Sequence, residues 1–314
     1  MSNNYTPAQF GKVAVMLGGS SAERAVSLKS GGAVLQALQQ AGVNAFAFDP
    51  AERELVALMD EKVDRVLIML HGRGGEDGSL QGALQQLCVP YTGSGVLGSA
   101  LCMDKIRSKQ IWQSLGLPTA KYKIAVKSRF DAGSCEAIMA ELGNTVMVKP
   151  SLEGSSIGMT KATSAAQLDS AIQDAFNYDN NVLLEQFIQG PEYTVSLLDG
   201  KALPSIRMST PRDFYDYAAK YQADSTEYFC PSGLDDEQEN LLATIASKAF
   251  DALAGSGWGR VDLMQDAGGR FYLLEANTVP GMTEKSLVPM AASQAGLSFE
   301  ALSLAILATS MEKR

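Results

Sequence analysis

The chain has 314 residues, of which 46% are hydrophobic and 19% are charged, an ordinary composition for a soluble globular protein. This length allows two or three domains with substantial cores. The formal net charge of −9 argues against a general nucleic-acid or membrane-surface binder, because such proteins need clustered cations, so neither partner is expected.

The first third of the chain predicts a doubly wound parallel sheet. Apolar runs at residues 12–19, 44–49 and 65–70 are typical of buried strands and alternate with segments of helical spacing. Such alternation produces a parallel sheet, which binds ligands at the carboxyl ends of its strands. Two loops follow such ends, GGSSAERAVS at 18–27 and HGRGGEDG at 71–78. The four glycines of the second loop indicate that its backbone closely approaches a ligand.

The middle of the chain predicts a small α+β lobe. Its strands are expected at 119–126, 145–150 and 182–188, and the glycine-serine loop SLEGSSIGM follows the second of them. Glycines let backbone N–H groups approach a phosphate, and serine hydroxyls add donors. Lys149 ends the strand before the loop, at a height from which it could reach a phosphate. Neither a P-loop nor a dinucleotide-binding glycine motif occurs, so the loop alone is a weak signal.

The last third predicts another α+β lobe. A hairpin at 192–208 turns at Asp199-Gly200, and a long helix is expected at 235–254. The stretch 209–233 between them is irregular and rich in tyrosine. Long loops in compact domains are usually functional or disordered, and the tyrosines favour an active-site cover. A second hairpin at 259–278 and two helices complete the chain.

This second hairpin predicts a metal site. With a two-residue turn at Gly268-Gly269, four polar residues share one face, where Asp262 lies opposite Glu275 and Arg260 opposite Asn277. The opposite face then carries Val261, Leu263, Leu274 and Ala276. Two facing acids repel each other, and a cation between them would remove the repulsion. Hard oxygen ligands suit Mg²⁺ or Mn²⁺, although an ordinary solvated strand face would show similar residues.

Seven motifs in this order resemble those of the D-alanine–D-alanine ligases of the ATP-grasp superfamily. They are GGSSAERAVSLKSG (18–31), HGRGGEDG (71–78), MDKIRSK (103–109), VKPSLEGSSIGM (148–159), FYDYAAKY (214–221), GWGRVDLM (257–264) and LLEANTVPGMTEKSLVP (273–289). The resemblance implies an ATP-grasp architecture, with an N-terminal doubly wound domain at 1–98 and two α+β lobes, 99–189 and 190–314, that clasp ATP. It also implies ATP-dependent joining of two D-alanines through an acyl phosphate, for peptidoglycan precursor synthesis, and a homodimer formed through the N-terminal region.

The resemblance also implies site residues, by matching position. The expected catalytic residues are Glu23, Ser155, Tyr221, Arg260 and Ser286. The expected substrate contacts are His71, Gly281 and Leu287. The expected ATP contacts are Lys105, Lys149, Glu185, Glu192 and Lys220. Two Mg²⁺ or Mn²⁺ ions are expected on Asp262, Glu275 and Asn277. Related ligases that make D-alanyl-D-lactate lack the tyrosine matched by Tyr221, so its presence favours an amine acceptor.

A cytoplasmic protein is expected. The polar N-terminus lacks a signal-peptide pattern, and no apolar run approaches the ~20 residues of a membrane span. The four cysteines form no CxxC pair and are expected to be buried thiols: Cys88, Cys102, Cys135 and Cys230.

Three other functions remain open at this point. They are a D-alanine–D-lactate or other carboxylate–amine ligase, a non-catalytic ATP-binding sensor on the same fold, and a metal-dependent phosphohydrolase. The presence of Glu23, Ser155, Tyr221 and Ser286 counts against the sensor.

Overall fold

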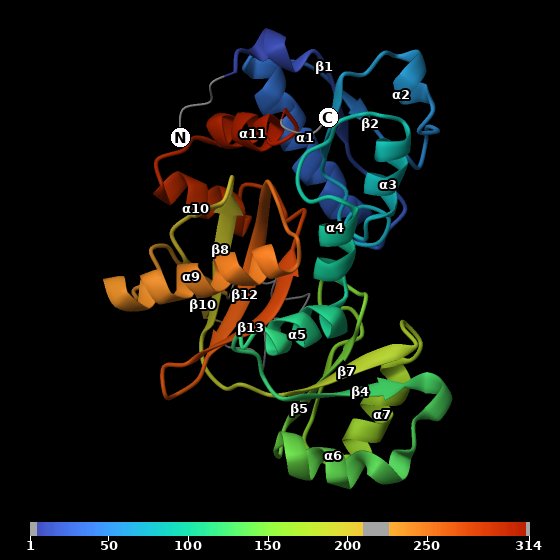
Figure 1. The fold of residues 1–314 in the computed structure, drawn as a ribbon, viewed down its shortest axis with the longest axis vertical. Coiled ribbons are helices and arrows are strands. Elements are labelled where there is room, and N and C mark those ends of the chain that lie inside the picture. Colours follow the sequence, from blue (N-terminus) through green and yellow to red (C-terminus); the bar gives the residue numbers. More distant parts are fainter. Residues whose placement is uncertain (1–4, 210–225, 312–314) are drawn as a thin grey trace.

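The computed structural model describes residues 5–209 and 226–311, and these residues form three sheets (Figure 1). One sheet is parallel and has three strands, and the other two are antiparallel, with six and four strands. The mixed architecture expected from the sequence is therefore confirmed. Tyr221 and Lys220, and most of the expected cover at 209–233, lie outside the described residues.

The parallel sheet lies in the N-terminal unit and has the strand order β2-β1-β3. Its elements are η1 (Pro7–Phe10), β1 (Lys12–Met16), α1 (Arg24–Gln40), β2 (Asn44–Phe48), α2 (Ala57–Asp60), β3 (Arg65–Ile68) and α3 (Ser79–Gln86). The loops that follow β1 and β3 are neighbours, since Ser21 Oγ donates to His71 O at 2.7 Å. Both expected ligand loops thus meet at the carboxyl edge of the sheet.

Two consecutive helices, α4 (Val96–Met103) and α5 (Lys105–Ser114), connect this unit to the rest. Asp104 separates them, and its carboxylate caps α5 by accepting from the N–H groups of Ile106 and Arg107, each at 3.0 Å. The domain boundary expected at 98/99 falls within α4.

The small lobe has the strand order β4-β7-β5-β6 and is the lower part of the molecule in Figure 1. Its elements are β4 (Tyr122–Val126), η2 (Lys127–Arg129), η3 (Ala132–Ser134), α6 (Cys135–Leu142), β5 (Val146–Pro150), β6 (Thr160–Ala162), α7 (Ala165–Ala175) and β7 (Asn181–Gln186). Val146 and Val148 share a core with α6 and α7. Because side chains alternate along a strand, Met147 and Lys149 face the opposite side.

The six-stranded sheet has the order β11-β10-β8-β12-β13, with β9 paired to β8. Its strands are β8 (Glu192–Leu198), β9 (Lys201–Ala202), β10 (Ile206–Ser209), β11 (Glu227–Phe229), β12 (Trp258–Gln265) and β13 (Phe271–Asn277). Helix α9 (Asp236–Ala252) covers one face. Trp112 ties α5 to this helix by donating from Nε1 to Ala249 O at 2.9 Å. Where the structure describes it, the stretch at 209–233 that was expected to be irregular includes the short strand β11.

The β12–β13 hairpin confirms the expected pairs but corrects the expected turn. Arg260 pairs with Asn277 and Asp262 with Glu275, as predicted. The loop has three residues, 267–269, because Asp266 N donates to Arg270 O at 3.0 Å. Only the second glycine, Gly269, has a positive φ, of 79°.

A β-bulge between the turn and Asp262 restores the predicted pairing of Asp262 with Glu275. Leu263 pairs with Leu273, whereas Asp262 pairs with Glu275, so Leu274 is the extra residue. As a result Leu273, and not the predicted Leu274, is fully buried in the core beneath α9. The bulge thus reconciles a three-residue loop with the facing acids.

The last two helices, α10 (Leu287–Gln294) and α11 (Phe299–Ala308), return to the N-terminal unit. Leu302, Ile306 and Leu307 share a core with the parallel sheet, and α11 lies against α1 (Figure 1). No single helix within 5–209 and 226–311 is long and apolar enough to cross a membrane, and only α10 with α11, bent by 106°, meets the length and composition criteria as a pair.

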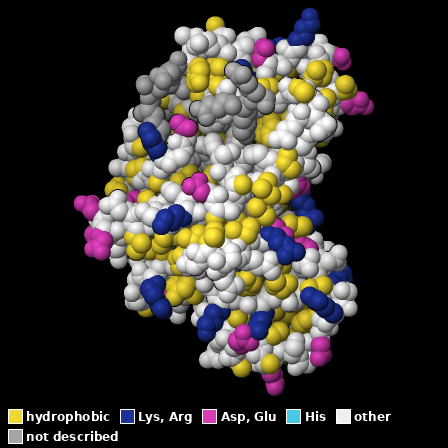
Figure 2. All heavy atoms as spheres, viewed as in Figure 1, with side chains coloured by type: hydrophobic (Ala, Val, Ile, Leu, Met, Phe, Trp, Pro, Cys, Tyr) yellow, Lys and Arg dark blue, Asp and Glu magenta, His cyan; other side chains and the backbone are white. Residues whose placement is uncertain are grey.

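The cysteines agree only in part with the expectation of buried thiols. All four are free, and Cys102 and Cys135 are buried. Cys88 is exposed, which corrects the prediction for that residue, and Cys230 is half-buried. Among the residues coloured in Figure 2, Lys and Arg lie scattered between acidic and apolar side chains, without a continuous basic patch on that face.

Candidate active site

One cavity lies where the N-terminal unit, the small lobe and the six-stranded sheet meet. Its walls come from the loops after β1 and β3, the glycine-serine loop, the β12–β13 hairpin and the segment leading to α10. The predicted site residues along these walls are Glu23, His71, Lys105, Ser155, Arg260, Glu275, Asn277, Gly281, Ser286 and Leu287. The structure therefore brings together residues that are up to 264 positions apart in sequence, from 23 to 287.

Asp262 is the buried centre of the polar hairpin face. Arg260 donates to both of its carboxylate oxygens, from Nε at 2.8 Å and from Nη2 at 2.7 Å. Thr194 Oγ1 donates at 2.6 Å and Asn277 Nδ2 at 3.1 Å. These four bonds fix the carboxylate and hold Arg260 and Asn277 on the same side of the sheet.

Glu275 is the second acid of this face, and it pairs with Lys105. Lys105 Nζ lies 3.3 Å from Glu275 Oε2 and donates to Glu153 O at 2.6 Å. The helix start at Lys105 is itself attached to the glycine-serine loop, because its N–H donates to Ser151 O at 3.1 Å. Lys105 thus connects the hairpin with that loop.

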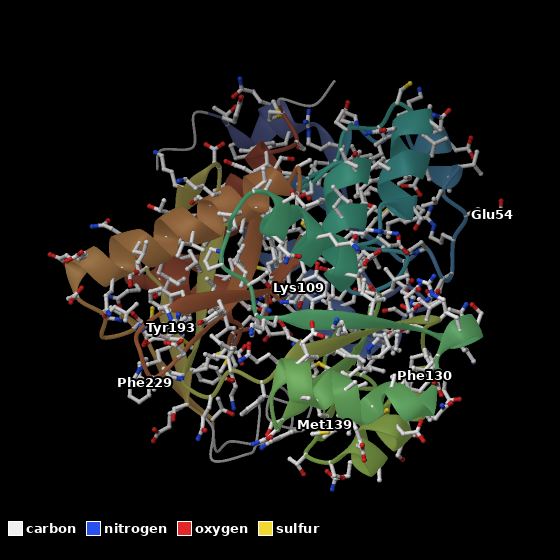
Figure 3. The ribbon with its side chains drawn as sticks, turned by 60° about the horizontal axis from the view of Figure 1, so that its bottom comes forward. Glu54, Lys109, Phe130, Met139, Tyr193 and Phe229 are labelled. Atoms are coloured by element: carbon white, nitrogen blue, oxygen red, sulfur yellow. The ribbon has the colours of Figure 1, made fainter. Side chains whose placement is uncertain are left out.

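A second charged cluster joins the small lobe to the larger body. Glu185 on β7 pairs with Lys149 Nζ at 2.7 Å and also with Lys109 of α5. Lys109 further donates to Thr119 Oγ1 at 2.8 Å and to Leu273 O at 3.0 Å. Lys109 is fully buried and lies near the centre of the molecule in Figure 3.

The charges of this cluster support one another. Burial alone would raise the pKa of Glu185, but Lys109 and Lys149 hold that pKa below its usual value. Burial lowers the pKa of Lys109 despite the facing carboxylate. Burial opposes the charge of Lys149 too, yet Glu185, with Glu275 and Glu192 further off, raises its pKa. Lys149 therefore stays cationic at the junction of the lobes.

Glu23 and Ser155 meet across the cavity. Ser155 Oγ donates to Glu23 Oε1, which joins the small-lobe loop to the N-terminal end of α1. Glu23 also fits closely beside Gly72, where a Cβ would lie 2.6 Å from Glu23 Oε2. The glycine in the HGRGGEDG motif thus makes room for this carboxylate.

His71 is buried, and protein groups occupy both ring nitrogens. Nδ1 lies 2.8 Å from Val279 O, and Nε2 lies 3.2 Å from Ser30 Oγ. Because a carbonyl only accepts, Nδ1 carries the proton and the Ser30 hydroxyl donates to Nε2. Burial lowers the pKa of His71, so the ring is neutral near pH 7. Its expected contact with a substrate carboxylate remains a prediction.

Glu76 is a site residue that the sequence did not single out. Its carboxylate accepts from Gly72 N at 2.7 Å and from Val279 N at 3.0 Å. Burial, reinforced by the charge of Glu23, raises the pKa of Glu76 to about 8. The group therefore holds a proton at neutral pH and links the loop after β3 to the loop after β13.

A Glu76→Gln variant is expected to flatten the pH dependence of stability. The folded pKa of Glu76 lies above its unfolded value, so its favourable contribution is complete below about pH 4.5 and is lost as pH rises through about 8. In that window the unfolding free energy of the wild type should fall by up to about 1.4 kcal/mol per pH unit on this account. Urea unfolding between pH 5.5 and 8.5 measures the slope; equal slopes in both proteins would contradict the assignment.

The segment before α10 forms the far wall of the cavity. Ser286 is the N-cap of α10, and its Oγ accepts from Thr283 N at 2.9 Å. A Cβ at Gly281 would lie 3.0 Å from that oxygen. Ser286, Gly281 and the N–H of Leu287 thus gather at a helix start, where backbone N–H groups favour an anion.

The sequence did not single out Lys109 or the apolar residues that lie on the same sheet face as Lys149 and Glu185. Met147 and Leu183 are buried on the same strands as Lys149 and Glu185, outside the helix-side core. The period of two along β5 and β7 was the available signal for this face. Lys109, one helical turn after Lys105, had the spacing signal but resembles an ordinary surface lysine in sequence.

Two antiparallel lobes that carry lysines and acids toward one cavity, beside a parallel N-terminal sheet, define an ATP-grasp ligase. Residues 47–94 match the family described as D-ala D-ala ligase N-terminus, and residues 111–308 match D-ala D-ala ligase C-terminus. The chain therefore belongs to the D-alanine–D-alanine ligase family.

Individual relatives agree with this assignment. The chain is 75% identical over 302 residues to the D-alanine–D-alanine ligase of Pseudoalteromonas atlantica, covering 96% of this chain and 95% of the relative. It is 58% identical over 304 residues to that of Idiomarina loihiensis, covering 97% and 98%. A crystal structure of the Bacillus anthracis ligase complexed with ATP is similar, with a TM-score of 0.84, 31% identity and coverage of 96% and 97%. A D-Ala:D-Ser ligase from Enterococcus faecalis has a TM-score of 0.79 at 30% identity, covering 94% and 98%.

Proposed function

We propose that this protein joins two D-alanines into D-alanyl-D-alanine, a peptidoglycan precursor, and converts ATP to ADP and phosphate. The observation that carries the proposal is one cavity lined by Glu23, Ser155 and Ser286 together with Lys105 and Glu275. The first three suit the ends of amino acids, and the last two suit phosphates and a cation. Close relatives over the whole chain are D-alanine–D-alanine ligases.

The chemistry requires an activated carboxylate. A carboxylate is a poor electrophile, since its charge repels nucleophiles and hydroxide is a poor leaving group. Transfer of the γ-phosphoryl group of ATP to the first D-alanine gives an acyl phosphate, and the amine of the second D-alanine attacks it. The tetrahedral intermediate then collapses to the dipeptide and phosphate.

The basic residues support the phosphoryl transfer. Lys105 and Lys149 are proposed to bind ATP phosphates, and Arg260 to stabilise charge on the transferring group and on the oxyanion. Arg260 is suited to this because Asp262 orients its guanidinium through two hydrogen bonds. Glu185 and Glu192 are proposed to bind adenosine, and Lys220 also belongs to this ATP set.

The oxygen donors on the hairpin suit magnesium or manganese. Asp262 and Glu275 face each other on paired strands, with the Asn277 amide beside them. Two carboxylates and one amide are hard ligands, and they leave positions for ATP phosphates. Within the described residues no group of three or more His, Cys, Asp or Glu that could hold a metal ion is found. When bound, Mg²⁺ or Mn²⁺, with two ions expected, would neutralise phosphate charge.

The proposed substrate residues suit two D-alanine molecules, bound as first and second substrate. Glu23 is proposed to accept the ammonium of the first D-alanine, with His71 near its carboxylate. Ser286 and the Leu287 N–H would bind the carboxylate of the second, and the Gly281 N–H would face the oxyanion. Tyr221, outside the described residues, is proposed to favour an amine acceptor.

Glu23→Gln is expected to raise the KM for D-alanine roughly tenfold while the KM for ATP changes less than about twofold. The reason is that a charge-assisted hydrogen bond to the ammonium becomes a neutral one, with a loss of about 1.4 kcal/mol. Steady-state ADP release with each substrate varied measures both constants. Similar increases in the two KM values would place Glu23 away from the amino acid.

The function is tested by measuring ADP and products with D-alanine, D-alanine plus D-lactate, L-alanine, and no amino acid. Dipeptide formation that depends on D-alanine is expected. Depsipeptide as the main product near neutral pH would instead identify a D-alanine–D-lactate ligase. Phosphate release without an acceptor would indicate a phosphohydrolase, and no release at all would indicate a sensor.

The remaining proposals concern setting and assembly. A cytoplasmic location is proposed, because the proposed reaction consumes ATP, which is an intracellular nucleotide. A homodimer through the N-terminal region is proposed from the family resemblance. Sedimentation analysis would test it by giving the mass in solution.

A further inference from the structure

Arg73, in the loop after β3, crosses from the N-terminal unit to the small lobe. Its Nη2 lies 2.7 Å from Glu153 Oε1, in the glycine-serine loop at 151–159. The same nitrogen donates to Tyr178 O at 3.2 Å, just beyond α7. One side chain therefore contacts the loop and the segment that supports it.

Both contacts reach anchor points of the glycine-serine loop. Glu153 is held through its backbone as well, since its carbonyl accepts from Lys105 Nζ at 2.6 Å. The Tyr178 ring packs against the other end of the loop, where a Cβ at Gly158 would lie 2.8 Å from Tyr178 Cδ2. Arg73 thus connects to the start of the loop directly and to its end through Tyr178.

The tip of this loop has a backbone conformation that needs support. Ser155 and Ser156 have φ values of 50° and 59°, in the left-handed backbone region that residues other than glycine rarely adopt. Such strain persists where the surroundings impose it, and it is often found in switching segments. Two contacts that hold this conformation are the hydrogen bond from Ser155 to Glu23 and the ion pair between Arg73 and Glu153. Both join the loop to the N-terminal unit.

We propose that Arg73 is a positioning residue that latches the glycine-serine loop shut over the first substrate while the acyl phosphate exists. This inference rests on the proposed ligase function. The Arg73 side chain is 47% exposed, so the ion pair is weak enough to release when product leaves. The latch acts on the loop that carries Ser155, and Arg73 itself does not line the cavity.

An open loop would waste the intermediate. Water would add its oxygen to the acyl carbon, and the bond from that carbon to the phosphate oxygen would break. The products would be D-alanine and inorganic phosphate, so that ATP would be converted to ADP without a dipeptide. The ratio of ADP to dipeptide therefore reports on closure of the loop. A defect in folding alone would lower both products and leave this ratio unchanged.

The experiment compares Arg73→Ala, Arg73→Lys and the wild type by ADP and dipeptide formed per unit time. For Arg73→Ala we expect the ADP-to-dipeptide ratio to rise above one and kcat/KM for D-alanine to fall by about 1.4-fold to fivefold, the range for an exposed ion pair. Arg73→Lys should recover part of the loss, because the charge remains. Arg53→Ala is the matched control, since Arg53 is 38% exposed and pairs with Glu61 inside the N-terminal unit.

Two further measurements separate the outcomes. Hydrogen exchange of the amides at 152–158 with ATP bound should be faster in Arg73→Ala, independently of dipeptide chemistry. The charge-reversed double variant Arg73→Glu/Glu153→Arg restores the ion pair, so its hydrogen exchange should be slower than that of Arg73→Ala. Unchanged exchange together with an unchanged ADP-to-dipeptide ratio would overturn the latch and leave the ligase function standing. A wild type that forms no dipeptide would overturn the ligase function and the role of Arg73 in it.

Discussion

Replacing Glu275 with alanine is expected to lower kcat roughly a hundredfold to a thousandfold, the range seen when one preorganised charge-stabilising group is removed. Glu275 lines the cavity, faces Asp262 across the paired strands and lies 3.3 Å from Lys105. Its loss removes a proposed metal ligand and also leaves Lys105 without this carboxylate. The negative charge on the phosphate groups during transfer would then be neutralised less completely.

The measurement is steady-state ADP release together with Mn²⁺ binding in the presence of nucleotide. Both should weaken in the Glu275→Ala variant, whereas Glu237→Ala, an exposed change in the first turn of α9, should alter neither. Activity within about tenfold of wild type, a barrier change of about 1.4 kcal/mol, would show that Glu275 is not a metal ligand.

The local geometry of the hairpin was predictable because strand pairing is a matter of counting. A period of two and an approximate turn position suffice to set Asp262 opposite Glu275. The three-residue loop and the bulge at Leu274 were not predictable, because their offsets cancel at the site. Packing beneath α9 decides between Leu273 and Leu274, and that packing is tertiary.

Contacts between units were the harder part of the site. The motif pattern indicated Glu23 and Ser155, although 132 positions separate them. Arg73 and Glu76 lie in the same glycine-rich motif as His71, but nothing in their spacing shows that one crosses to the small lobe and the other turns inward. Such roles depend on how units dock, and docking leaves no periodic signal in a sequence.

The return of α11 to the N-terminal unit has the same cause. Its apolar residues, such as Leu302 and Ile306, predict a buried helix but not the partner that buries it. Only the fold shows that they join the core around the parallel sheet. The N-terminal unit and α11 thus share one core, whereas the small lobe and the α9 face of the six-stranded sheet each have a separate one.

Lys109→Met is expected to destabilise the protein by about 3 kcal/mol, the lower end of the cost of breaking a buried ion pair. Lys109 is fully buried, and it holds Glu185 of the small lobe and Leu273 O of the larger sheet at the same time. Methionine keeps the length of the apolar stem but removes every donor. Glu185 would then keep Lys149 as a charged partner, at 2.7 Å, and would lose its other cation.

Thermal unfolding and nucleotide binding together test this expectation. A midpoint lower by about 4–5 °C is expected for a chain of this size, because the entropy of unfolding grows with chain length. ATP should also bind more weakly, because Lys149 and the orientation of the lobes both depend on Glu185. The matched control is Lys12→Met, which breaks a pair with Glu61 whose side chains are 34% and 29% exposed and which should change stability by less than about 1 kcal/mol.

A double variant distinguishes a charge effect from a packing effect. The double variant Lys109→Met/Glu185→Gln removes both charges of the pair, so no unpaired carboxylate is left buried. Adding Glu185→Gln to Lys109→Met should therefore destabilise the protein far less than Glu185→Gln does in the wild type. If the two single effects simply add, the charges of Lys109 and Glu185 are not coupled and the midpoint shift of Lys109→Met reflects packing. Coupling would instead mean that the buried ion pair between Lys109 and Glu185 determines how the small lobe meets the six-stranded sheet.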